Sequence, residues 1–155
     1  MLVNTKHFGK IEVDKEHVNT FDEGIFGFTE YHKFTIIHEN DIFCWLQSIE
    51  DKDIVLPMIC TPLVFPDYAP EVNDEMILRI GDLKEEDLLL YTIIVVPTDI
   101  EKMTTNLKAP IIINTKTKKG IQVILDSDKY EIKHNLYEPL KQLKQKAGEW
   151  YASII

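Results

Sequence analysis

The sequence is poor in the residues from which several common classes of site are built. Its 155 residues include two cysteines, Cys44 and Cys60, and a single arginine, Arg79. The cysteines fit no metal or redox spacing, and each falls in an apolar run, so we expect buried, reduced thiols. No stretch approaches the roughly 18 uninterrupted apolar residues of a membrane span, so we expect no association with a membrane.

The opening segment, MLVNTKHFGK, lacks the basic-then-apolar layout of a secretory signal. Together with the cysteine usage, this favours a cytoplasmic protein. Low-complexity tracts, internal repeats and linkers rich in Gly, Ser or Pro are also missing, so the length predicts a single folded unit. No strong homodimer surface stands out, and we expect a monomer.

The common catalytic motifs are missing as well. There is no G-x-S-x-G elbow, no phosphate-binding glycine loop and no H-E-x-x-H, and no two of the five histidines lie at helical metal spacing. Acidic runs such as Glu85–Asp87 are typical of a solvated face. The sequence therefore predicts no catalytic residue, no metal ligand set and no cofactor. One alternative stays open, a carboxylate-dependent enzyme with a site assembled in the mouth of a barrel.

Charge is unevenly distributed along the chain. The formal net charge is −9; residues 1–101 hold 21 acids against 7 basic residues, giving −14, and residues 102–155 hold 5 acids against 10 lysines, giving +5. An acidic surface repels RNA and attracts basic proteins, although it also simply maintains solubility. With only one arginine, direct nucleic-acid binding is not expected.

Short runs with strand character recur at close spacing, which indicates a β-sandwich or a small barrel. These runs are Leu2–His7, Lys10–Val13, Phe34–His38, Ile42–Ser48, Ile54–Cys60 and Leu88–Val96. The continuous run Leu88–Val96 suits a central strand buried on both faces. Pro57 has no backbone N–H, so we expect its strand to lie at an edge or to bend there.

Two segments have helical character. In NDEMILRIG, Asn73 or Asp74 is a candidate N-cap and Gly81 a candidate stop. Near the C-terminus, apolar residues recur at alternating spacings of four and three, and Asn135 is a candidate cap. They are Leu136, Leu140, Leu143, Ala147, Trp150 and Ile154. We therefore divide the chain into a β domain over residues 1–134 and an amphipathic helix over residues 135–155, packed on that domain or extending from it.

The block NLKAPIIINTKTKKGIQVIL, Asn106–Leu125, consists of two apolar runs separated by a turn rich in lysine. It is predicted to form a hairpin in which Gly120 supplies permissive dihedral angles. An ordinary charged hairpin tip would have the same pattern. Asn106 and Asn114 flank the first run, where either side chain can satisfy local backbone groups.

This block, with the preceding TT, resembles the signature of the flagellar assembly factor FliW family. Further family landmarks follow in order: TKHFGKIEV, FDEGIFGF, LQS and DY. The resemblance runs from about Asn4 to His134. One departure is Phe26, which stands where the family pattern has proline.

The resemblance implies regulatory binding without catalysis, on a small, mostly antiparallel β-barrel-like fold; this chain adds short helical insertions and a C-terminal helix. Members act as chaperone-like partners that bind cytoplasmic flagellin. When flagellin is scarce they bind the translational regulator CsrA and relieve its repression of flagellin mRNA. As candidate partner-binding residues we select Phe65, Tyr68, Asn106, Lys108 and Asn114. For Phe65, core packing is an equally good interpretation.

Overall fold

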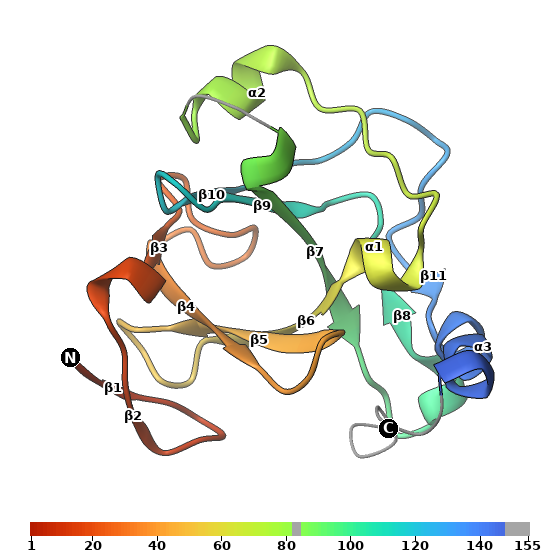
Figure 1. Cartoon of the computed structure of the whole chain (residues 1–155), viewed down its shortest axis with the longest axis horizontal. Helices are drawn as coiled ribbons and strands as arrows, with labels where there is room; N and C mark the ends of the chain where they lie inside the picture. Colours follow the sequence, from red (N-terminus) through yellow and green to blue (C-terminus); the bar gives the residue numbers. More distant parts are fainter. Residues whose placement is uncertain (82–84, 148–155) are drawn as a thin grey trace.

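The computed structural model describes residues 1–81 and 85–147. Its centre is a closed ring of strands in the order β7-β6-β5-β4-β3-β10-β9, with β9 pairing back to β7 (Figure 1). Their bounds are β3 Asn19–Thr20, β4 Lys33–His38, β5 Phe43–Ser48, β6 Val55–Cys60, β7 Leu88–Val95, β9 Ile111–Asn114 and β10 Lys119–Gln122. Every neighbouring pair is antiparallel except β3 and β10. The mainly β, barrel-like fold predicted from the sequence is confirmed.

Strand β7 changes partner along its length. Residues Leu88–Tyr91 pair with β9, whereas Ile94 and Val95 pair with β8 (Thr104–Thr105). Strand β8 then pairs on its other edge with β11 (His134–Asn135). The sheet therefore divides around the middle of β7, where β9 closes the barrel on one side of the division and β8 and β11 extend the sheet on the other.

The barrel interior is filled by alternate side chains of the strands. Buried residues from six elements of the chain form one cluster, which includes Phe21, Phe34, Leu46, Met58 and Ile111. Phe21 and Phe34 meet edge to face with ring centroids 5.5 Å apart. An apolar core thus fills the middle of the barrel, and any hollow lies at one of the two ends of the barrel.

The two cysteines lie on the neighbouring strands β5 and β6. Cys44 is buried in the barrel cluster and Cys60 is half-buried. Burial raises the pKa of both thiols, that of Cys44 to about 12. Because the thiolate is the reactive form, both groups are poor nucleophiles in the folded protein.

Elements outside the ring pack on its periphery (Figure 1). The N-terminal hairpin, β1 (Leu2–Asn4) and β2 (Lys10–Glu12), forms its own two-stranded sheet. The short helices are η1 (Lys15–His17), α1 (Thr61–Val64), α2 (Asp74–Leu78), η2 (Glu85–Asp87) and η3 (Ile100–Lys102). The Asn73 side chain accepts a hydrogen bond from the Met76 N–H at 2.8 Å, which confirms the predicted cap. None of the described helices has the length and apolar character needed to cross a bilayer.

The final helix, α3, spans Tyr137–Ala147. The predicted cap is present, because the Asn135 Oδ1 accepts a hydrogen bond from the Glu138 N–H at 3.1 Å. Leu136 and Leu140 are fully buried in a second cluster, against residues of β5, β6 and β7, and Leu143 packs on its edge. Ala147 is the last residue of the helix, and the other two members of the predicted stripe, Trp150 and Ile154, lie outside the described residues.

Two local predictions differ from the structure. Strand β6 pairs on both sides, so the expected edge position is wrong, whereas the alternative of a bend at Pro57 stays a prediction. Pro57 is tolerated because the β6–β7 ladder begins only at Met58, so its missing N–H removes no bond there. In the Thr115–Gly120 turn the left-handed residue is Lys118, with φ of 59°, and not Gly120.

Gly120 is required for space. A Cβ built on Gly120 would lie 2.4–2.8 Å from three ring atoms of Phe21, whose side chain is fully buried. The glycine therefore admits the aromatic ring to the barrel interior, and a larger residue would displace it.

We expect Gly120→Ala to lower the free energy of unfolding by about 1–3 kcal/mol, because it overpacks a rigid core. Urea denaturation of Gly120→Ala, Phe21→Leu and the double variant measures this. The smaller leucine relieves the clash, so the double variant should be more stable than the sum of the single effects. Strictly additive effects would contradict the clash.

A candidate partner-binding groove

One end of the barrel opens into an apolar groove of about 380 Å³. We call it the β7–β10 groove, because its walls come from the end of β7 and from the chain that continues β10. It is lined by Phe26, Ile93, Val95, Thr104, Asn106, Lys108, Ala109, Gln122, Ile124, Ile132 and Lys133. The groove brings together five separate segments of the chain.

The apolar side chains of this groove are unusually exposed. Phe26 is 52% exposed, Ile124 54%, Val95 59% and Ile132 61%. Single exposed apolar side chains are normal on protein surfaces, but their convergence on one concavity marks an interaction site. The β7–β10 groove is therefore the candidate functional site.

The alternation of β7 explains how apolar residues reach the groove. Tyr91, Ile93 and Val95 lie on one face of the strand, because side chains two residues apart point the same way. Tyr91 is buried in the barrel, Ile93 is half-buried and Val95 is exposed. The prediction that this run is buried on both faces is thus wrong at both ends of β7, where Leu89 is 39% and Val95 59% exposed.

The Gln122 side chain fixes one wall of the groove. Its Oε1 accepts a hydrogen bond from the Phe26 N–H at 2.9 Å, and its Nε2 donates to the Ala109 carbonyl at 3.2 Å. The loop that carries Phe26 turns at Gly24, whose φ of +68° favours glycine. Proline, which the resemblance led us to expect at position 26, could not donate this bond. Phe26 therefore provides both a tether and an exposed ring.

Asn106 and Lys108 line the groove from the chain between β8 and β9. The Asn106 Oδ1 accepts hydrogen bonds from the N–H groups of Lys108 and Ala109, both at 3.1 Å. The Lys108 carbonyl accepts a further bond from the Leu125 N–H at 2.8 Å. Asn106 thus acts locally on the backbone, as its sequence position suggested, and it holds the half-buried Lys108 at the groove.

The structure places the other three selected residues away from the groove. Tyr68 is buried and donates to the Leu107 carbonyl at 2.6 Å, and burial raises the pKa of its phenol. Phe65 packs edge to face on His134 with ring centroids 5.3 Å apart. Asn114 is fully buried and accepts hydrogen bonds from two N–H groups of the following turn. These contacts give all three a structural role, and partner binding by them stays a prediction.

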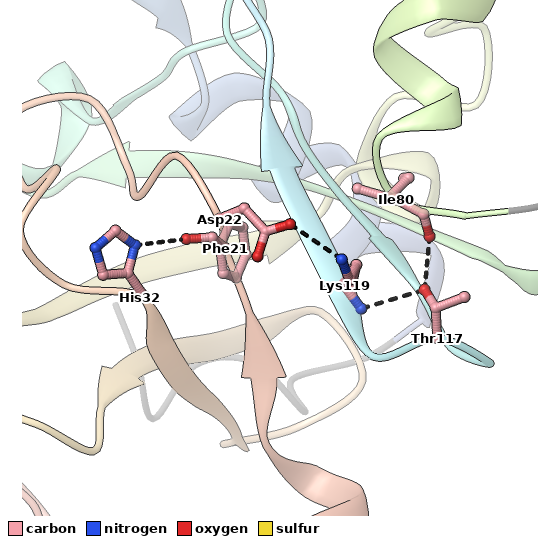
Figure 2. A network of polar contacts seen from close by, with 6 residues as sticks. All are labelled: Phe21, Asp22, His32, Ile80, Thr117 and Lys119. Atoms are coloured by element: carbon pink, nitrogen blue, oxygen red, sulfur yellow. Dashed lines mark hydrogen bonds and ion pairs between the residues drawn. The ribbon is translucent and has the colours of Figure 1, made fainter.

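The lysine-rich turn is held by contacts within the chain (Figure 2). Lys119 pairs with Asp22 at 3.1 Å, and the Thr117 hydroxyl donates to the Ile80 carbonyl at 2.6 Å. Lys116 pairs with Asp87 at 3.5 Å. Two of its three lysines thus face carboxylates of neighbouring segments, which supports the interpretation of this turn as a structural hairpin tip.

A second hollow, of about 440 Å³, lies at the opposite end of the barrel. Its apolar lining includes Tyr91 and Ile113, and its rim carries Glu12, Glu16, His17 and His38. The ligand atoms of Asp14, Glu16 and His17 lie within 4.8 Å of one another, but all three side chains are exposed. Glu12 pairs with the N-terminal amine at 2.9 Å. Active sites commonly bury an acidic side chain and so shift its pKa, whereas the acidic side chains of this cluster are exposed. The enzymatic alternative therefore gains no support here.

Sequence reasoning did not identify the four most exposed residues of the groove, Phe26, Val95, Ile124 and Ile132. Val95 lay in a run that resembled a buried strand. Phe26 was noted only as a departure from the family pattern. Ile124 and Ile132 carry no local signal, because their convergence depends on the tertiary fold.

Comparison with known proteins identifies the family. The model of the FliW protein family matches residues 2–136. The chain is 49% identical over 146 residues to the flagellar assembly factor FliW of Thermoanaerobacter pseudethanolicus, covering 91% of this chain and 96% of the relative. It is 40% identical to that of Lachnoclostridium phytofermentans, covering 96% and 99%. A crystal structure of the flagellar assembly factor FliW superposes with a TM-score of 0.83 at 32% identity, covering 88% of this chain and 96% of that one.

We expect Gln122→Leu to destabilise the protein by about 1–3 kcal/mol, because it leaves the Phe26 N–H and the Ala109 carbonyl without their partner. Hydrogen exchange at the Phe26 amide should accelerate. Urea denaturation and amide exchange by NMR measure the two effects. Gln142→Leu, on the exposed face of α3, is the matched control and should change neither. Unaltered exchange at Phe26 in Gln122→Leu would show that the tether is unimportant.

Proposed function

Since this chain belongs to the FliW family and is a flagellar assembly factor, we propose that it works by binding cytoplasmic flagellin before export, and that flagellin docks in the β7–β10 groove. The protein binds a partner and catalyses no reaction. Its relatives are named as assembly factors, which accords with a binding role. The observation that supports the location is the convergence of four exposed apolar side chains on one concavity.

The second part of the proposal is a partner switch. When flagellin is scarce, the protein binds the translational regulator CsrA and relieves its repression of flagellin mRNA. Two partners that exclude one another on a single protein are governed by linkage, so the partner with the larger ratio of concentration to dissociation constant dominates. The net charge of −9 suits encounter with a basic RNA-binding protein and disfavours binding of RNA itself.

Flagellin docking in the groove predicts that a charge placed on its apolar lining will abolish the complex. Val95→Asp and Ile124→Asp should each weaken flagellin binding by at least about tenfold, because the new carboxylate removes apolar contact and must be desolvated when the partner covers the groove. Isothermal titration calorimetry with flagellin from the same organism measures this. Leu78→Asp changes an exposed leucine of α2, outside the groove, and is the control. Undiminished binding by both groove variants would locate flagellin elsewhere.

The partner switch predicts a result in gel-shift assays with flagellin leader RNA. The protein alone should not shift the RNA, since the chain is acidic, but it should reverse a shift produced by CsrA. Added flagellin should then restore the CsrA shift. A direct shift by this protein would instead favour nucleic-acid binding, and no effect on the CsrA–RNA complex would remove CsrA from the proposal.

A further inference from the structure

We propose that the β7–β10 groove selects a helical segment whose aliphatic stripe is flanked by carboxylates. Lys108 and Lys133 form ion pairs with those carboxylates. This inference rests on the proposed function, because it specifies the chemistry of the partner that occupies the same groove. It concerns selectivity, which is separate from whether the groove is used at all. A purely apolar groove would accept any amphipathic helix of suitable size.

The charges around the groove are the first support. Lys108 and Lys133 are the only charged residues among its lining residues, although the chain carries 26 acidic residues against 17 basic ones. Neither lysine forms an ion pair with any other residue that the structure describes. Lys116, Lys119 and Arg79 face carboxylates, whereas most other lysines that the structure describes form no ion pair, as Lys108 and Lys133 do not. The groove thus presents two available cations on a predominantly acidic protein.

The two lysines enter the groove from different segments. Lys108 lies between β8 and β9, and its N–H and carbonyl are both hydrogen-bonded, to Asn106 and to the Leu125 N–H. Lys133 immediately precedes β11, whose residues His134 and Asn135 pair with β8. The backbone of Lys108 is therefore held by hydrogen bonds, and Lys133 adjoins a paired strand, so both side chains begin at ordered parts of the chain.

The pairing of the wall favours a helix as the occupant. Val95 pairs with Thr104 across β7 and β8, and the other edge of β8 pairs with β11. Strand β8 is paired on both edges, and the outer edge of this wall belongs to β11, which has two residues. So short an edge suits the addition of a partner strand poorly, and recognition in the groove then depends on side chains. An apolar groove read through side chains suits a helix whose aliphatic residues recur at i, i+3, i+4 and i+7.

Three synthetic peptides test the inference directly. They share one leucine stripe at helical spacing, which is flanked by Glu, by Gln or by Lys, and their helicity is matched by circular dichroism. Fluorescence anisotropy should rank binding to the wild-type protein as Glu, then Gln, then Lys. We expect the Glu peptide to bind about 5- to 10-fold more tightly than the Gln peptide, as two exposed ion pairs allow. The difference in affinity between the Glu and Gln peptides should shrink as the salt concentration rises from about 50 to about 300 mM, because salt screens exposed ion pairs.

Charge reversal provides the matched comparison. Lys108→Glu with Lys133→Glu should reverse the ranking, so that the Lys peptide binds best. Lys10→Glu with Lys52→Glu makes the same change in net charge at exposed lysines outside the groove, and should leave the ranking unchanged. Equal affinities for the three peptides, no binding of any of them, or reversal by the control pair would each overturn the inference.

A flagellin titration separates this inference from the proposed function. Flagellin that binds the wild type but is insensitive to Lys108→Glu with Lys133→Glu would refute selection by carboxylates and leave flagellin binding intact. If flagellin does not bind the wild type at all, the proposed function fails, while the peptide ranking still reports the preference of the groove.

Discussion

The pairing of one edge of β7 with two different strands in succession, β9 and then β8, is the constraint on which the rest of the structure depends. Its first half closes the barrel through β9, and its second half turns to β8. Hydrogen bonds fix this division, because the N–H and C=O groups of a strand must find partners along its whole length. Where β7 exchanges β9 for β8, residues that continue the interior face of β7 line the groove, and Val95 is exposed there. The groove is therefore a direct result of strand pairing.

Buried polar side chains then stabilise the walls of that opening. Gln122 connects the Phe26 loop to the start of β9, and Asn106 satisfies two N–H groups of the chain between β8 and β9. Every buried side-chain polar atom among the described residues has a partner. Such networks hold irregular backbone in one arrangement, because each member is costly to leave unsatisfied. The groove is thus preorganised, which reduces the ordering required when a partner binds.

Sequence reasoning succeeded where the signal was local. Alternation and β-branched runs predicted the main strands, and the caps at Asn73 and Asn135 followed from residue type and position. The family resemblance rested on a long contiguous block. Sequence reasoning failed where the outcome depended on tertiary neighbours. Gly120 is needed because Phe21, 99 positions earlier, fills the space beside it. The groove was half predicted, since Asn106 and Lys108 line it, but its apolar residues converge only after folding.

The barrel has an odd number of strands, seven, and this has a topological consequence. Around a closed ring, strand direction can alternate without exception only if the number is even. One parallel seam is therefore unavoidable, and it falls between β3 and β10, where a single residue pair, Thr20 with Lys119, is in register. After Thr20, the last residue of β3, the chain enters the loop that bears Phe26. Parity thus requires one such seam and leaves its place to the fold, and Asn19 and Lys118, next to the pair, line the hollow at the end of the barrel opposite the groove.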